Sequence, residues 1–114
     1  MSEIFEGEVQ EVYSGDDIIV LVNLKVEELF KRVRFRLHGV DTPNAIGAGA
    51  VTEAGRLRVY VRNLCRDKKV RLTITSKNAN SWVGVLEIQN EAGEYFNLNE
   101  DLCAQGYKYK RERS

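Results

Sequence analysis

Three short segments in the first half of the chain carry residues that could bind a phosphate and a metal ion. Asp16 and Asp17 lie in one turn, and Asp41 and Thr42 lie in another, with Arg36 between the two turns. Paired carboxylates with hydroxyl and carbonyl oxygens are ligands that Ca²⁺ and Mg²⁺ prefer. A guanidinium binds a phosphate through two parallel hydrogen bonds, so this set suits phosphodiester chemistry. A simpler interpretation is that the aspartates are turn residues that bond to their own backbone.

Alternating and β-branched segments predict the strands that hold these turns. Residues 8–13 and 18–22 are typical of strands, and the Gly-Asp pair between them signals a turn. Residues 32–38 alternate strictly, so one face of that strand is apolar and the other is cationic. The cationic stripe consists of Arg32, Arg34, Arg36 and His38. If the strands pair in sequence order, the two aspartate turns lie at neighbouring corners of a barrel.

The remaining elements complete a small α+β fold. Apolar residues at spacings of three and four predict a helix that begins at Thr52 or Glu53. Further strands are predicted at 69–75, 82–89 and 95–96, followed by a helix over 98–105 with Gly106 as its cap. This order indicates an antiparallel barrel of about five strands with one inserted and one appended helix. The arginines of the first helix are predicted to lie on its solvated face: Arg56, Arg58, Arg62 and Arg66.

Length and composition predict one globular domain over residues 1–114. The charges balance, with 17 Lys and Arg against 17 Asp and Glu, which argues against nucleic-acid binding by bulk charge alone. Charge segregated onto one face remains compatible with this balance. No apolar run reaches the ~18 residues of a membrane span, so no membrane partner is expected. The acidic start lacks the features of a signal peptide, and we therefore expect a cytoplasmic protein.

The cysteines and the histidine give no sign of a structural metal site. Cys65 and Cys103 lie far apart in the sequence, and His38 is the one histidine of the chain. A zinc site would need mostly carboxylate ligands, so structural zinc is not expected. Buried thiols are the expected state, because the cytoplasm disfavours a disulfide between the two cysteines.

The motifs resemble the staphylococcal nuclease (thermonuclease) family in order and spacing, from about Phe5 to Lys108. The matching pieces are Ser-Gly-Asp-Asp at 14–17, Glu-Ala at 53–54 and Leu-Asn-x-x-Leu-x-x-x-Gly at 98–106. The most specific piece is Arg-Leu-His-Gly-Val-Asp-Thr-Pro-Asn at 36–44. The resemblance implies an OB-fold, namely a five-stranded barrel with one inserted and one C-terminal helix.

Part of the family's site carries over residue by residue. The resemblance implies that Asp16 and Asp41 are calcium ligands and that Thr42 adds its carbonyl oxygen to the same ion, which could also be Mg²⁺. It also implies that Arg36 binds the phosphate of the substrate.

Two catalytic positions of the family are changed. Asn44 stands at the position of the glutamate that positions or deprotonates water, and an amide cannot take the proton. Val83 falls at the position of a second arginine and cannot stabilise charge on phosphorus. Losing one such donor typically costs about 10²–10³ in rate, and losing a general base a further ~10²–10⁴.

Three hypotheses follow. The favoured one is a catalytically degenerate nuclease-like barrel that binds single-stranded DNA or RNA, or a protein partner, and holds a divalent cation. In it, backbone contacts come from the cationic stripe, Arg32, Arg34, Arg36 and His38. The second is an active Ca²⁺- or Mg²⁺-dependent phosphodiesterase. It would need a carboxylate such as Glu53 in place of the base, and Lys77 or another cation of a helix or strand in place of the missing arginine. The third is a structural or protein-interaction module without metal or nucleic acid.

Overall fold

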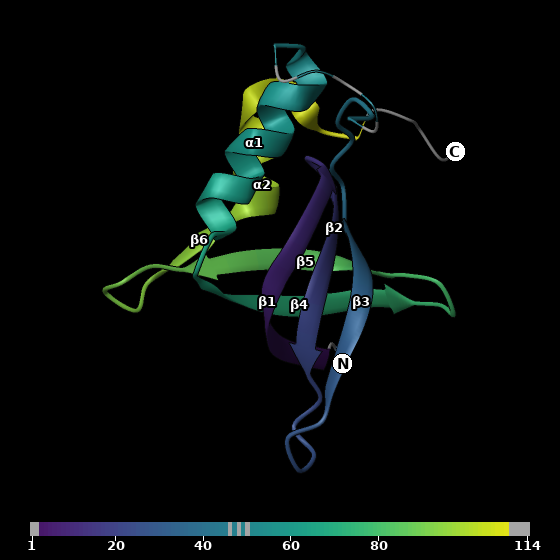
Figure 1. Cartoon of the computed structure of the whole chain (residues 1–114), viewed down its shortest axis with the longest axis vertical. Coiled ribbons are helices and arrows are strands. Elements are labelled where there is room, and N and C mark those ends of the chain that lie inside the picture. Colours follow the sequence, from purple (N-terminus) through teal and green to yellow (C-terminus); the bar gives the residue numbers. More distant parts are fainter. Residues whose placement is uncertain (1–2, 46, 48, 50, 110–114) are drawn as a thin grey trace.

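Five strands of the computed structural model close into a barrel, and the structure describes residues 3–45, 47, 49 and 51–109. β1 pairs with β2 and β4, β2 pairs with β3, and β4 pairs with β5, all antiparallel. A parallel pairing of β3 with β5 closes the ring (Figure 1), which is consistent with an OB-like barrel. The strands are β1 (Glu3–Ser14), β2 (Asp17–Asn23), β3 (Phe30–Leu37), β4 (Lys69–Lys77) and β5 (Trp82–Gln89).

The closing contact corrects the prediction of an antiparallel barrel. Phe35, Arg36 and Leu37 of β3 pair in parallel with residues 82–84 of β5, so the barrel is mixed. A parallel pair needs a long crossover, and the segment between these strands, which includes a helix and β4, supplies it. Periodicity shows which face of a strand is buried, but it does not identify the strand's second neighbour.

Both helices lie on the same side of the barrel (Figure 1). The first, α1 (Glu53–Cys65), begins where the sequence predicts, because the Thr52 hydroxyl accepts a hydrogen bond from the Gly55 N–H at 3.0 Å. The second, α2 (Leu98–Leu102), continues into a π-helical turn, η1 (Cys103–Tyr107), in which Gly106 has a φ of 103°. The short strand β6 (Tyr95–Asn97) extends the sheet beside β5. In the described part of the chain, no helix is both long and apolar enough to cross a membrane.

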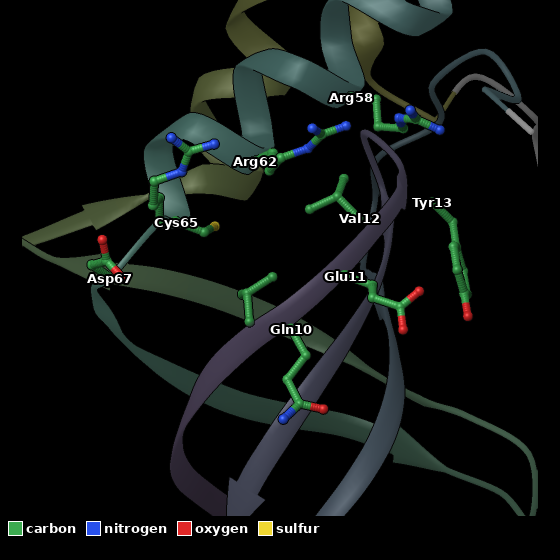
Figure 2. A pocket seen from close by; sticks show the side chains of 10 residues that line it. Gln10, Glu11, Val12, Tyr13, Arg58, Arg62, Cys65 and Asp67 are labelled. Carbon is green, nitrogen blue, oxygen red and sulfur yellow. The ribbon is translucent and has the colours of Figure 1, made fainter.

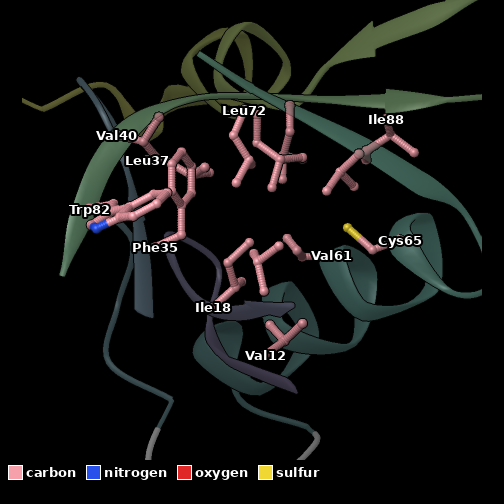
Figure 3. Packing of buried hydrophobic residues seen from close by; sticks show 14 of the residues in the cluster. Val12, Ile18, Phe35, Leu37, Val40, Val61, Cys65, Leu72, Trp82 and Ile88 are labelled. Carbon is pink, nitrogen blue, oxygen red and sulfur yellow. The ribbon is translucent and has the colours of Figure 1, made fainter. Parts of the chain in front are cut away.

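The core fills the barrel and the space beneath α1. Phe35 is fully buried and lies beside Trp82 (Figure 3), which confirms that the apolar face of β3 points inward. Cys65 packs near Val61 at the α1 side of the same cluster. Both cysteines are free thiols, and burial raises the pKa of Cys65 to about 12.

A buried asparagine joins the end of β3 to β5 and α2. The Oδ1 of Asn99 accepts a hydrogen bond from the Leu86 N–H at 2.9 Å. Its Nδ2 donates to the carbonyls of His38 and Gly84 at 2.9 and 3.1 Å. The β4 strand approaches closely here, since a Cβ at Gly84 would lie 2.0 Å from the Thr73 carbonyl oxygen. Asn99 therefore fixes the segment that carries the candidate site.

Candidate phosphate-binding corner

Asp16 lies at the centre of a buried polar corner. The residue is 5% exposed, and its carboxylate accepts hydrogen bonds from the hydroxyls of Ser14 at 3.1 Å and Thr42 at 2.9 Å. Gly15 allows the two turns to approach, because a Cβ there would lie 2.9 Å from the Thr42 methyl carbon. The structure thus brings together the two turns that the sequence places at neighbouring corners.

Arg36 lies at the edge of this corner with its guanidinium half exposed. One terminal nitrogen lies 3.9 Å from the second carboxylate oxygen of Asp16, a loose ion pair. Along the backbone, Arg36 is in register with Asp17 on β2 and with Val83 on β5. The guanidinium is therefore held near a carboxylate but keeps most of its hydrogen-bonding capacity for a ligand.

A hollow of about 400 Å³ opens in front of Arg36. The segment after η1 forms one wall, because Val40 bridges to Lys108 and the Tyr109 N–H donates to the Gly39 carbonyl at 2.8 Å. The lining carries both charges and an aromatic ring: Asp16 is acidic, Arg36 and Lys108 are basic, and Tyr109 supplies the ring. The lining includes Asp16, Arg36, His38, Val83, Lys108 and Tyr109.

Asp41 and Asn44 are not part of the lining of this hollow. Both residues are exposed, and the Asp41 N–H donates to the carbonyl of Tyr107 at 2.8 Å. Of the three predicted metal ligands, the structure brings Asp16 and Thr42 into contact through the Thr42 hydroxyl. Within the described ranges, no three His, Cys, Asp or Glu side chains cluster closely enough to hold a metal.

The corner as arranged does not match the donor set of a formed cation site. Asp16 already receives two hydroxyl donors and faces the Arg36 cation. A Ca²⁺ ion needs six to eight oxygen ligands, of which this carboxylate supplies at most two. Binding of Ca²⁺ or Mg²⁺ would require the hydroxyls to turn away from Asp16, and it stays a prediction.

The cationic stripe of β3 is largely neutralised by carboxylates of β1 and β2. Asp17, which is 6% exposed, accepts two hydrogen bonds from Arg34, at 2.9 Å from Nε and 2.5 Å from a terminal nitrogen. That bond raises the pKa of Arg34 above its ordinary value. Arg32 forms an ion pair with Glu11 across β2. Of the three arginines, Arg36 is thus the one most available to a phosphate, and exposed His38 lies beside it.

The groups suggested as replacements for the missing catalytic residues lie elsewhere. The Glu53 carboxylate accepts a hydrogen bond from the Tyr107 hydroxyl, which raises the pKa of that tyrosine. Lys77 pairs with Glu3 at 2.8 Å and lies 4.6 Å from the centre of the Trp82 ring. Neither lines the hollow, whereas Lys108 does. Lys108 begins a basic run of the sequence, a pattern that is typical of a solvated tail. That pattern does not predict the backbone bridge between Lys108 and Val40.

No protein-family model matches this chain, and no curated protein matches it significantly. The resemblance to the nuclease family therefore rests on the motifs in the sequence and stays a prediction. What the site can do has to be judged from its own geometry.

Proposed function

We propose that this chain is a staphylococcal-nuclease-like OB-fold domain that binds the phosphates of single-stranded nucleic acid and hydrolyses them slowly or not at all. The observation that carries the proposal is the position of Arg36. Its half-exposed guanidinium faces a hollow that Lys108 also lines, while Val83 occupies the adjacent position on β5. Two cations around one hollow can bind a phosphate by charge-assisted hydrogen bonds.

The same geometry supports weak or absent catalysis. The hollow's lining includes one carboxylate, that of Asp16, which is buried and already accepts hydrogen bonds from two hydroxyls. A general base must reach the proton that it removes and must be free to accept it. Val83 offers no charge to the transition state, so the corner can hold a phosphodiester but lacks the groups that would break it.

Binding of a divalent cation is a separable part of the proposal. Titration with Ca²⁺ or Mg²⁺, followed by the melting temperature, tests it directly, since a ligand that binds the folded state raises that temperature. An ion that binds at Asp16 raises the melting temperature of the unaltered protein but not that of Asp16→Asn. Equal shifts in both proteins would place the ion elsewhere.

Fluorescence anisotropy with a labelled single-stranded deoxyoctanucleotide at low salt tests the binding itself. Replacing Arg36 with alanine should weaken binding about tenfold and reduce the salt slope by about 0.7, the value for one lost phosphate contact on a single strand. Arg56→Ala is the matched control, because Arg56 is exposed on α1 and does not line the hollow. Unchanged affinity in Arg36→Ala would contradict the proposal.

A second candidate function is a slow metal-dependent phosphodiesterase, favoured by the position of Lys108 beside Arg36. In that case Lys108 would supply the charge that Val83 lacks. Incubation of the oligonucleotide with the protein and Ca²⁺ or Mg²⁺ across pH 7–10 separates the candidates. Cleavage that disappears in both Arg36→Ala and Lys108→Ala supports the enzyme. Failure to bind or cleave would leave a structural or protein-interaction module.

A further inference from the structure

A groove of about 570 Å³ lies between α1 and the second half of β1. Figure 2 shows Arg58 and Arg62 on the helix wall, with Val12 and Tyr13 on the strand wall. The groove contains more cationic side chains than the hollow at Arg36. Its charged lining consists of Arg58, Arg62, Arg66, Glu11 and Asp67.

The three arginines of this groove are not paired with the two carboxylates that also line it, those of Glu11 and Asp67. Arg58, Arg62 and Arg66 form no ion pair or side-chain hydrogen bond in the described part of the chain, whereas Arg32, Arg34 and Arg36 each face a carboxylate. Glu11, which could have neutralised them, is bound by Arg32. Arg62 and Arg66 are exposed, in agreement with the predicted solvated helix face, whereas Arg58 is half-buried. All three also line the groove together with β1.

Arg58 points most clearly to a missing ligand. Its Nε is buried from solvent and has no hydrogen-bond partner in the described structure. A buried donor without an acceptor is unfavourable, and native proteins seldom leave one unpaired. The helix dipole gives a simpler reason for cations at the end of α1, namely Arg62 and Arg66, but Arg58 lies too far from that end for this reason. An anion in the groove would balance the positive charge of all three.

The spacing of the arginines favours a phosphodiester strand as that anion. They recur every four residues, so a rise of 1.5 Å per residue separates them by about 6 Å along the helix. This step is comparable to the distance between successive phosphates of an extended single strand. Tyr13 lines the groove and is half-buried, and the Arg34 guanidinium lies 6.0 Å from the centre of its ring. The Tyr13 ring offers a surface on which a base can stack.

We propose that the groove between β1 and α1 is a second phosphate-binding surface, which holds the backbone of a single-stranded nucleic acid. The inference rests on the proposed nucleic-acid binding, and it assigns part of the same ligand to a surface other than the Arg36 corner. An acidic peptide, even one with regularly spaced charges such as polyglutamate, lacks the flat bases that Tyr13 could stack. Nucleic acid is therefore the occupant that these residues fit best.

The test compares Arg58→Gln/Arg62→Gln with unaltered protein in the octanucleotide anisotropy assay. Glutamine keeps part of the side chain and removes the charge, and Arg56→Gln on the same helix is the matched control. We expect at least a tenfold loss of affinity and a salt slope smaller by about 1.4, the value for two single-strand phosphate contacts. Affinity and slope equal to those of the control would overturn the proposal. Arg62→Gln alone, with an expected slope change of about 0.7, serves if the double variant folds poorly.

Two further measurements separate this inference from the proposed function. A loss in the groove variant with none in Arg36→Ala supports the groove and overturns the corner, whereas the reverse pattern overturns the groove alone. Polyglutamate of the same charge should compete with the labelled octanucleotide at least tenfold less well than unlabelled octanucleotide. Equal competition would overturn the assignment to nucleic acid and indicate an acidic protein segment instead.

Discussion

Replacing Asn99 with alanine should destabilise the protein more than any change of an exposed polar residue. Asn99 is 6% exposed, and its side chain makes three hydrogen bonds that join β5, α2 and the end of β3. The substitution removes the acceptor of the Leu86 N–H, which belongs to a fully buried residue. The carbonyl of Gly84 keeps a second donor, the His38 N–H at 2.8 Å.

The expected magnitude follows from these partners. Leaving the Leu86 N–H unsatisfied costs about 1–3 kcal/mol, and each of the other lost bonds costs about 0.5–1.5 kcal/mol. The His38 carbonyl belongs to an exposed residue and can bond to water, which reduces its share. We therefore expect the free energy of unfolding to fall by about 2–4 kcal/mol. The same change should loosen His38 and Arg36 relative to β5 and weaken oligonucleotide binding.

Urea unfolding, followed by circular dichroism, measures this change. With a slope of roughly 2 kcal/mol per molar urea, the midpoint should fall by about 1–2 M while the slope stays the same. Asn63→Ala is the matched control, because Asn63 is an exposed asparagine of a helix, α1. A midpoint for Asn99→Ala within experimental error of the control would refute the role assigned to Asn99.

Three further predictions concern the charges, the buried thiol and the missing catalytic groups. Asp17→Asn should lower the free energy of unfolding by about 1 kcal/mol, because the ion pair with Arg34 is lost. The same change should strengthen oligonucleotide binding, because Arg34 becomes free to bind a phosphate. Weaker binding in an anisotropy titration would contradict this. The pKa of Cys65 is raised from 9.0 unfolded to about 12 folded, so the unfolded state loses its proton first. Stability should therefore fall above pH 9, and this thiol should account for about 1.4 kcal/mol of the fall between pH 7 and 10. Urea unfolding of Cys65→Ala should show a fall that is smaller by this amount. Equal falls in the two proteins would refute the prediction. Asn44→Glu combined with Val83→Arg should raise the rate of cleavage of single-stranded DNA at least ~100-fold with Ca²⁺ or Mg²⁺, as measured on gels. No gain would show that the corner differs from that of the nuclease family.

Local patterns in the sequence predict most of the elements. The strict alternation over 32–38 identifies the buried face of β3, and Thr52 marks the start of α1 because a hydroxyl there caps the first turn. The approach of the Asp16 turn to Thr42 also follows once neighbouring strands are paired in order. These features depend on residues close in sequence or on one strand pairing with the next.

The features that the sequence does not predict depend on contacts between distant elements. Arg34 pairs with Asp17 because β2 and β3 adopt a particular register, which a pattern of alternating charge does not specify. The arginines of α1 face a groove because the helix lies against β1, whereas the helical pattern alone indicates only that they lie off the apolar face. Asn99 shows the same limit, since its partners come from three elements.

An NMR titration of ¹⁵N-labelled protein with a 5′-phosphorylated deoxydinucleotide tests most directly whether the Arg36 corner binds a phosphate. A ligand this short can fill the corner without spanning the groove between β1 and α1. We predict saturable shifts of the amides at 36–40, 83–84 and 108, and their loss in Arg36→Ala. Shifts confined to other parts of the barrel, or none at low salt, would contradict it.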